Sequence, residues 1–508
     1  MTDEQRMAAD EAASRGDVPP EDDPFVVRRA KLDALREAGE QPYADHWDVT
    51  ARAAQLEAEY ASLEAGTEAD AAVSVAGRLV AKRDQGKIVF LVIRDATGDL
   101  QLFTRINLVG EDAFEAIKDL DLGDWIGAVG TVMRTRRGEL SVAPTTVTLL
   151  SKSLRPLPEK YHGLSDTETR YRQRYVDLIS NPEVRDVFAT RFRIVAAIRR
   201  YMEAAGYLEV ETPMLHAIPG GATAKPFVTH HNALDMSLYL RIAPELYLKR
   251  LLVGGFERVY EINRSFRNEG ISIRHNPEFT MLEAYQAYGN MSSMLDLTEG
   301  IVTSAAEEAL GTDQIEYQGT RVSLASPWRR ATMIELTSSA AGEDVGFGRT
   351  VEELRALCVK HEVPFETNFG KGKLITELFE KLVEHTIVEP TFVTMYPAET
   401  SPLARRNYDD PDLTDRFELI ILGREYANAF SGLVDPIDQR GRFEAQAAAK
   451  DAGDDEAMWV DEDYLRAQEY GMPPAGGMGL GIDRLVMLLT DSASIRDVLL
   501  FPHMRPEA

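Results

Sequence analysis

Residues 264–283 read RSFRNEGISIRHNPEFTMLE, and this stretch decides the fold of the larger part of the chain. A helix at this spacing would bury charge without a continuous apolar stripe. The residues before it (258–263) and at its end (278–285) alternate or run apolar, as antiparallel strands do. The stretch therefore predicts a hairpin with a charged loop. Its charged side chains are Arg264, Arg267, Glu269, Arg274, His275, Glu278 and Glu283.

The forked guanidinium groups of this hairpin suit a ligand with paired oxygens. On a rigid support they match phosphate and carboxylate groups bidentately. A solvated charged loop is the alternative interpretation on these residues alone.

The region around the hairpin, residues 181–508, has the pattern of an α+β domain. Expected strands at 238–242, 256–263, 279–285 and 416–423 follow one another as hairpins rather than as βαβ units, which favours an antiparallel sheet. Between about 290 and 390 the pattern is mainly helical, and we expect an insertion into that sheet.

Residues 72–150 change to short alternating strands separated by turn signals. Five such strands with one helix near 110–120 predict a small closed barrel of the oligonucleotide-binding (OB) type. Another small β-barrel or a sandwich is the alternative. Before the barrel, residues 1–24 have the composition of a disordered acidic leader and residues 25–71 a helical pattern. A Pro- and Arg-bearing linker (151–180) follows the barrel.

Composition limits the classes of function. The 508 residues carry a formal net charge of −27, which argues against indiscriminate coating of nucleic acid. This charge is uneven: residues 1–70 hold 7 basic and 18 acidic residues, whereas residues 71–150 hold 10 of each. Cys358 is the only cysteine, so an internal disulfide and a thiolate zinc cluster are excluded. No apolar run is long enough to span a bilayer and no secretory signal is present, so a cytoplasmic location is expected.

Two further stretches have the residue types of a ligand site. Residues 476–484 (GGMGLGIDR) let the backbone approach a ligand closely and end in Arg484, although tight helix–strand packing explains the glycines equally well. Residues 241–249 (RIAPELYLK) place Glu245 in the first turn of a helix, where a carboxylate can bind an ammonium group or simply interact with the helix dipole.

A third stretch, residues 415–430 (DRFELIILGREYANAF), contains Glu418 and Glu425. Seven residues apart in a strand, they lie on opposite faces unless a bulge near Gly423 restores one side. Together they would hold Mg²⁺, and apart they are surface acids. Neither a Ser-His-Asp pattern nor a metal-binding histidine pattern stands out, so chemistry would rest on positioning and electrostatics, as in nucleotidyl transfer.

In this order, the stretches resemble the three signature motifs of class II aminoacyl-tRNA synthetases. Residues 206–213 (GYLEVETP) resemble motif 1, with Pro213 at a dimer interface; residues 256–283 resemble motif 2 and residues 476–489 motif 3. The chain is similar to bacterial lysyl-tRNA synthetases over nearly its whole length. Matching segments include KSLRPLPEKYHGL, RYRQRYVDLI, LYLRIAPELYLKRLLVGGFERVYEINRSFRNEGISIRHNPEFTMLE, SPLARRN and AGDDEAM.

The resemblance implies a lysine–tRNA ligase that is a homodimer, uses ATP and Mg²⁺, and acts on L-lysine and tRNA(Lys). It also implies roles for single residues. Catalytic residues would be Arg267, His275 and Arg484. ATP would contact Arg267, Glu269, His275, Asn276, Phe279, Glu425 and Arg484. Lysine would contact Gly221, Glu245, Arg267, Glu283, Tyr285, Asn428 and Phe430. Glu418 and Glu425 would carry the metal. The barrel would bind the anticodon through Arg78, Phe90, Gln101 and Glu139.

The chain departs from the family pattern in the amino-acid pocket. Gly432 stands where a Glu is usual, Val434 where Asn is usual and Lys225 where Arg is usual. A buried charge that loses half its partners costs about 2–5 kcal/mol. The alternatives for Gly432 are an unchanged lysine substrate, a variant with weakened lysine activation, or a paralogue whose pocket is widened for a lysine analogue. A lysyl ligase acting on a protein and a non-catalytic scaffold are further alternatives.

Overall fold

The computed structural model describes residues 23–158, 164–451 and 458–507, which fall in two compact units, Met1–Gly163 and Leu164–Ala508. The expected leader (1–24) lies almost entirely outside the described residues. So do parts of two stretches that resemble the synthetases, at 159–163 and 452–457.

The first unit begins with two helices, α2 (Pro24–Glu37) and α3 (Ala53–Glu59). The Asp23 side chain caps α2 by accepting a hydrogen bond from the amide of Phe25. Leu32 of α2 and Leu56 of α3 are buried, which accounts for the apolar spacing in this segment.

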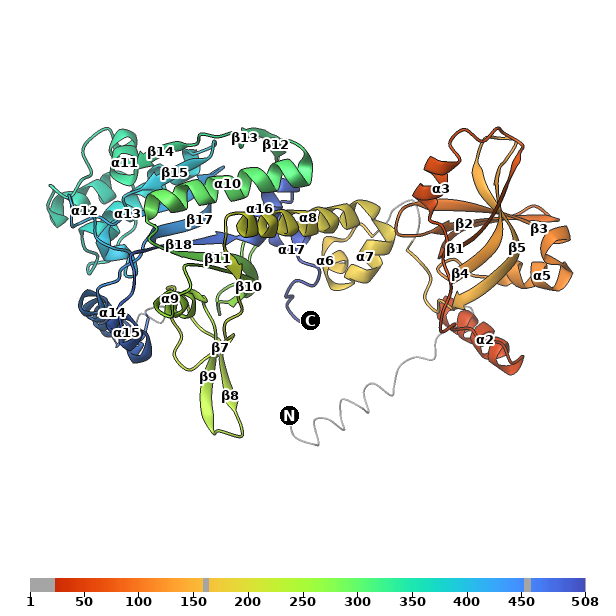
Figure 1. Ribbon diagram of the computed structural model, residues 1–508, viewed down its shortest axis with the longest axis horizontal. Helices are drawn as coiled ribbons and strands as arrows, with labels where there is room; N and C mark the ends of the chain where they lie inside the picture. The colour runs from red at the N-terminus through yellow and green to blue at the C-terminus, as the bar shows by residue number, and fades with distance from the viewer. Residues whose placement is uncertain (1–22, 159–163, 452–457, 508) are drawn as a thin grey trace. The chain divides into compact units, whose positions relative to one another are not determined.

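A closed five-stranded barrel with the strand order β1-β2-β3-β5-β4 forms the body of the first unit (Figure 1). Alternate residues of each strand fill its interior, including Leu79, Leu91 and Leu102. The first strand begins at Glu68, four residues before the expected boundary at 72, because β1 extends to pair with the far end of β4. The elements are β1 (Glu68–Asp84), β2 (Ile88–Arg94), β3 (Asp99–Arg105), α4 (Ile106–Val109), α5 (Glu111–Asp119), β4 (Trp125–Arg134) and β5 (Leu140–Ser151).

The second unit is organised by an eight-stranded sheet with the order β14-β15-β16-β17-β18-β11-β10-β6. Neighbouring strands from β15 to β10 are antiparallel, and the two edge strands pair in parallel. The strands are β6 (Leu208–Glu209), β10 (Arg258–Phe266), β11 (Glu278–Ala287), β14 (Arg329–Thr332), β15 (Thr391–Thr394), β16 (Arg416–Ile421), β17 (Arg424–Ser431) and β18 (Ala475–Gly481).

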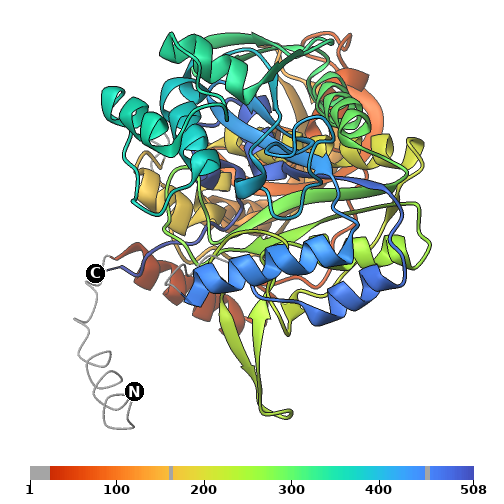
Figure 2. The same cartoon turned by 90° about the vertical axis from the view of Figure 1, so that its left-hand side faces the viewer.

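Helices cover this sheet (Figures 1 and 2). Three of them, α8 (Pro182–Ala204), α10 (Met291–Leu310) and α16 (Ile482–Leu489), pack in one hydrophobic core with the sheet. A second core joins α11 (Met333–Ala341), α12 (Val351–Lys360) and α13 (Lys371–Leu382) to Val393 and Ile420. The remaining helices are α6 (Thr167–Arg172), α7 (Arg174–Ser180), α9 (Glu245–Val253), α14 (Pro436–Asp451), α15 (Glu462–Glu469), α17 (Ile495–Val498) and the 3₁₀ turns η1 (Glu384–Thr386) and η2 (Ala398–Thr400).

The stretch 290–390 is mainly helical, as expected, but only part of it is an insertion into the sheet. Its first helix, α10, packs beside α8 on the sheet, and its strand β14 pairs with β15. Along the chain, a hairpin of β12 (Gln314–Tyr317) and β13 (Thr320–Ser323) separates α10 from β14. The sequence pattern did not distinguish these parts because β12, β13 and β14 have only four residues each.

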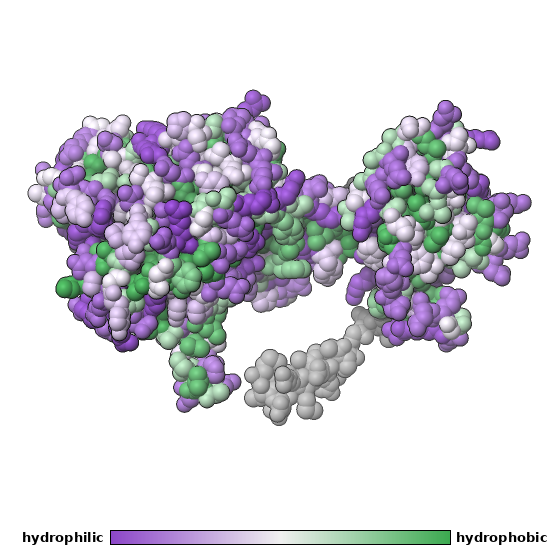
Figure 3. Space-filling view, in the orientation of Figure 1, coloured by the Kyte–Doolittle hydropathy of each residue, from purple (hydrophilic) through white to green (hydrophobic). Residues whose placement is uncertain are grey.

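A small three-stranded sheet extends from the second unit. Its strands are β7 (Leu215–His216), β8 (Val228–His231) and β9 (Met236–Leu240), in the order β7-β9-β8. Apolar side chains are exposed along it at Leu215, Val228 and Leu234 (Figure 3). Searching the described helices finds no segment of sufficient length and apolarity to cross a membrane.

Candidate functional site

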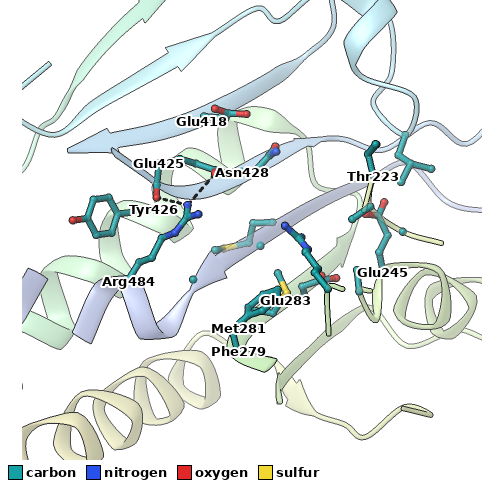
Figure 4. A pocket seen from close by; sticks show the side chains of 18 of the residues that line it. Thr223, Glu245, Phe279, Met281, Glu283, Glu418, Glu425, Tyr426, Asn428 and Arg484 are labelled. Atoms are coloured by element: carbon teal, nitrogen blue, oxygen red, sulfur yellow. Dashed lines mark hydrogen bonds and ion pairs between the residues drawn. The ribbon is translucent and has the colours of Figure 1, made fainter. Parts of the chain in front are cut away.

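A cavity of about 470 Å³ lies on the large sheet of the second unit. Its wall combines β11, β16, β17 and β18 with the β10–β11 loop and the start of α9 (Figure 4). All the residues that we expected to bind ATP, lysine or metal contribute to this wall. Residues spread over 260 positions in the chain are thus brought to one place by the sheet order.

The β10–β11 hairpin supplies one side of the cavity. Nine residue pairs set its register, from Arg258 opposite Gln286 to Phe266 opposite Glu278. The predicted hairpin is confirmed. The loop carries Arg267, whose guanidinium carbon lies 5.1 Å from the centre of the Phe279 ring.

Asn276 has a bracing role in this loop. It is buried, its side-chain amide donates to the carbonyl of Glu278 at 2.5 Å, and its Oδ1 accepts from the amide of His503 at 3.2 Å. Asn276 therefore connects the loop to the C-terminal segment as well as lining the cavity.

Cationic groups gather at the end of the cavity next to this loop. Arg267, Arg274, His275 and Arg484 all line it. Burial and then the positive charge of Arg484 lower the pKa of His275, with Arg274 and Arg267 adding to the effect. In its neutral form His275 can donate or accept a hydrogen bond, and the arginine side chains offer guanidinium donors. This arrangement matches a polyanion such as a phosphate chain.

Arg484 occupies the first turn of α16, directly after β18. Its Nη1 donates to the Glu425 carbonyl at 2.8 Å and to the Glu425 carboxylate at 3.0 Å (Figure 4). This double contact directs the guanidinium toward the acidic strands β16 and β17.

Carboxylates dominate the opposite end of the cavity. Glu283 and Glu245 are both buried there, and the Tyr285 hydroxyl donates to Glu283 at 3.0 Å. Burial and then repulsion from Glu245 raise the pKa of Glu283 to about 8. An ammonium group is the ligand that would restore the ionised form.

Gly477 makes room for Tyr285. A Cβ at position 477 would lie 2.3 Å from Cε1 of the Tyr285 ring, closer than atoms can approach. The glycine run of β18 thus serves packing at Gly477, whereas Gly479 and Gly481 border the cavity. Packing therefore accounts for Gly477, and close approach to a ligand stays a prediction for Gly479 and Gly481.

The other residues expected at the lysine end have defined surroundings. Gly221 has a φ of +89° and lies so close to α9 that a Cβ there would be 3.1 Å from the Cβ of Glu245. Asn428 accepts a hydrogen bond of 3.1 Å from Nε of Arg416. Phe430 follows on the same face of β17 and also lines the cavity.

Glu418 and Glu425 share one face of the sheet. Glu418 pairs with Asn428 and Ile420 pairs with Glu425, so Tyr426 is one extra residue in β17. Paired residues lie on the same face, and so do residues two apart in a strand. The irregularity is at Tyr426 and not at Gly423, which instead forms the β16–β17 turn with Leu422, both at positive φ.

The two carboxylates are close enough to affect one another. Burial and then repulsion from Glu425 raise the pKa of Glu418 to about 7. Arg416 offsets part of this with a contact of 2.6 Å to Glu418. Two oxygen-donor carboxylates that repel each other fit a hard divalent cation shared with phosphate oxygens.

The barrel of the first unit carries the other predicted site. Strand register places Arg78, Phe90 and Gln101 on the outer face of the barrel. The residues that alternate with them along the strands, such as Leu91 in β2, are buried. Gln101 donates to Ser141 at 2.8 Å. Glu139 is exposed in the turn before β5.

Comparison with known proteins adds direct evidence. Residues 166–505 match the family model described as tRNA synthetases class II (D, K and N), and residues 73–150 match the OB-fold nucleic acid binding domain. The chain is 56% identical over 482 residues to the lysine–tRNA ligase of Pelotomaculum thermopropionicum, covering 94% of each chain. It is 53% identical to that of Enterococcus faecalis (98% of this chain, 100% of the relative) and 52% to that of Bacillus subtilis (95% and 97%).

The chain belongs to the lysine–tRNA ligase family. The resemblance, the α+β class II fold with its OB barrel, and the assignment to the aminoacyl-tRNA synthetase class of enzymes are thereby confirmed. The relatives are nearly as long as this chain, so both units belong to the shared architecture.

Sequence reasoning missed several residues in and around this cavity. Arg416 contacts Glu418 and Asn428 at once, and Asp483 joins Arg191 at 2.6 Å to the amide of Thr280 at 2.7 Å. Arg416 and Asp483 lie inside the quoted stretches 415–430 and 476–484. Their charge was the only signal in the sequence that could have suggested them. Arg191 lies on α8, far from any of these stretches, and nothing in the sequence marked it.

The barrel also carries aromatic and basic side chains near Phe90 that sequence reasoning did not single out. Phe103 lies 5.1 Å from Phe90, between their ring centres, and Arg83 and Arg105 lie over these two rings. Phe103 is two residues from Gln101 in β3 and pairs with Phe90 of β2. Its spacing from Gln101 was a usable signal in the sequence.

Proposed function

We propose that this protein is a lysine–tRNA ligase that activates L-lysine with ATP and transfers it to the 3′ end of tRNA(Lys). One observation carries the proposal: a single cavity has buried carboxylates at one end and a group of cations at the other. Lysine presents ammonium groups and ATP presents phosphates, so the two ends match the two substrates in charge. Membership of the lysine–tRNA ligase family supports the same assignment.

At the cationic end, the residues have the chemistry to bind ATP. Arg267 would bind the α-phosphate together with the lysine carboxylate, and His275 and Arg484 would hold the β- and γ-phosphates. Phe279 would stack on the adenine ring and Glu269 would accept from its amino group. Asn276 would keep the loop in place through the contacts described above.

At the acidic end, Glu245 would hold the α-ammonium of lysine. Glu283 would pair with the side-chain ammonium while Tyr285 donates to the same carboxylate. Asn428 and Phe430 would enclose the side chain, and Gly221 would allow close approach beside Glu245.

Glu418 and Glu425 would hold Mg²⁺, which when bound would neutralise charge on the phosphates of ATP. Arg416 would keep Glu418 in place, and Arg484 would keep Glu425 in place.

The reaction would proceed in two transfers that conserve atoms. A carboxylate oxygen of lysine attacks the α-phosphorus, the bond from that phosphorus to the bridging oxygen breaks, and pyrophosphate leaves. The terminal hydroxyl of tRNA then attacks the carbonyl carbon of lysyl-adenylate, loses its proton, and AMP leaves. The protein acts by orientation and by stabilising developing charge, with Arg267 at the reacting phosphate.

The barrel would hold the anticodon of tRNA(Lys). Phe90, with Phe103 beside it, offers rings on which unstacked bases can lie, and Arg78, Gln101 and Glu139 offer polar contacts. A ligase that acts on a protein would not need this surface.

We also infer a homodimer that works in the cytoplasm. Apolar side chains are exposed at Leu208 and Leu215, in or next to the stretch that resembles motif 1, and at Phe192 of α8; Pro213 is exposed as well. Exposed apolar side chains of this kind suit a symmetric protein interface.

ATP–pyrophosphate exchange with a panel of amino acids, followed by charging of bulk tRNA, tests the activity. We expect exchange with lysine and charging of tRNA(Lys) alone. Exchange with no amino acid would contradict synthetase activity, and exchange without charging would indicate a different acceptor.

A further inference from the structure

A buried lysine stands beside the amino-acid end of the cavity. Lys249 lies one helical turn after Glu245 in α9, and its Nζ is 2.5 Å from the Glu245 carboxylate. Its ammonium also lies 5.0 Å from the centre of the Phe430 ring and 5.8 Å from that of Tyr285. Lys249 thus contacts three of the residues that surround the expected position of lysine.

Such a cation is unexpected where a cationic substrate binds. Lys249 has none of its surface exposed, and a buried ammonium is stable only when it is paired. Among the described residues, Glu245 is the carboxylate with which Lys249 forms an ion pair. Burial raises the pKa of Glu245, and Lys249 opposes that rise.

Gly432 lies beside the stem of Lys249. A Cβ built at Gly432 would be 3.9 Å from Cε of Lys249 and 3.4 Å from the carbonyl oxygen of Ala475. Both distances are ordinary van der Waals contacts, so a side chain at position 432 would begin beside the stem of Lys249.

We propose that Lys249 is a positioning residue of the amino-acid site, which keeps Glu245 ionised and oriented for the α-ammonium, and that Gly432 leaves Lys249 paired with Glu245 alone. This inference rests on the proposed function, since it concerns how tightly lysine binds. A carboxylate at position 432 would lie close enough to the Lys249 stem to share its ammonium. The pocket would then hold one more negative charge to attract the ammonium groups of lysine.

Two substitutions test the inference in lysine-dependent ATP–pyrophosphate exchange. Lys249→Met keeps the bulk and removes the charge, so we expect the KM for lysine to rise about tenfold or more while the KM for ATP changes less than about twofold. Gly432→Glu adds the second acceptor, and we expect the KM for lysine to fall. Gly432→Ala separates the effect of added bulk from that of charge.

Lys373→Met is a matched control, because Lys373 forms an ion pair of 2.8 Å with Glu377 at the same four-residue spacing in α13, away from the cavity. It should leave both KM values unchanged. Melting temperatures of all variants show whether they fold.

The possible results separate the inference from the proposed function. An unchanged KM for lysine in Lys249→Met, or equal rises for lysine and ATP, would overturn the positioning role. A KM for lysine that does not fall in Gly432→Glu would overturn the role of Gly432. If the parent protein shows no exchange with lysine, the proposed function fails and the inference fails with it.

Discussion

The hydroxyl of Tyr285 donates a hydrogen bond of 3.0 Å to the buried carboxylate of Glu283. The two residues are on the same face of β11, and Gly477 on the adjacent strand β18 leaves room for the ring. This contact opposes the rise in the pKa of Glu283 that burial and Glu245 cause. The Glu283 carboxyl can therefore be neutral or ionised, and an ammonium group bound beside it would favour the ionised form.

Lysine binding should therefore depend on pH. Burial and repulsion from Glu245 raise the pKa of Glu283 to about 8, with Tyr285, Arg241 and Glu261 as the other groups that act on it. Below this pH Glu283 is protonated in the empty pocket and must lose a proton to pair with lysine. We expect the KM for lysine to rise by up to about tenfold per pH unit as the pH falls below about 8.

Glu283→Gln is the control for this pH dependence. It should remove the slope and raise the KM for lysine about 100-fold or more, since a charge partner is lost. A carboxyl whose pKa is raised on folding costs stability above its unfolded pKa, so this variant should also melt higher at alkaline pH. A KM for lysine that is flat with pH in the parent protein would contradict the assignment.

Metal dependence should respond to Glu418. Replacing it by Gln removes a carboxyl whose pKa burial and then repulsion from Glu425 raise to about 7. We expect the Mg²⁺ concentration for half-maximal exchange to rise about tenfold or more, because a ligand charge is lost. The melting temperature without Mg²⁺ should stay the same or rise. A lower melting temperature together with unchanged Mg²⁺ dependence would indicate a purely structural role.

A methyl group at Gly477 should disturb lysine binding. In Gly477→Ala the new Cβ would meet the Tyr285 ring at 2.3 Å, so the ring must move away from Glu283. Overpacking of this kind costs about 1–3 kcal/mol of unfolding free energy, and the KM for lysine should rise with little change in that for ATP.

Gly441→Ala provides the comparison. Gly441 lies in α14 with no atom within 4 Å of its added Cβ, so stability should hold or increase. Equal effects of both substitutions on the KM for lysine would show that contact with Tyr285 is not the cause.

The barrel should affect tRNA without affecting amino-acid activation. Phe90→Ala removes a ring on which a base would stack, a loss of about 1–3 kcal/mol. We expect the KM for tRNA(Lys) in charging to rise about fivefold to 100-fold, since each 1.4 kcal/mol is tenfold. ATP–pyrophosphate exchange should be unchanged. An unchanged KM for tRNA(Lys) would contradict the stacking role, and a lower maximal rate of exchange would indicate that the substitution unfolds the protein.

The hairpin, the barrel and the acidic and cationic stretches were readable from local patterns. Strand alternation predicted β10 and β11 within a few residues and the number of barrel strands, because side chains in a strand alternate between faces. Four-residue strands such as β14 have too short a pattern to be recognised, and α10 resembles an inserted helix until its contacts with the sheet are known.

The sequence by itself determined which residue types were available: arginines on a loop, carboxylates on strands and glycines before a helix. Only the tertiary structure decided how they combine. One extra residue at Tyr426 puts Glu418 and Glu425 on the same face, and the antiparallel order β17-β18-β11 brings Arg484 and Glu283 to one cavity. The position of Lys249 between Glu245 and Gly432 was likewise decided by packing, because a buried charge goes where a partner and free space coincide.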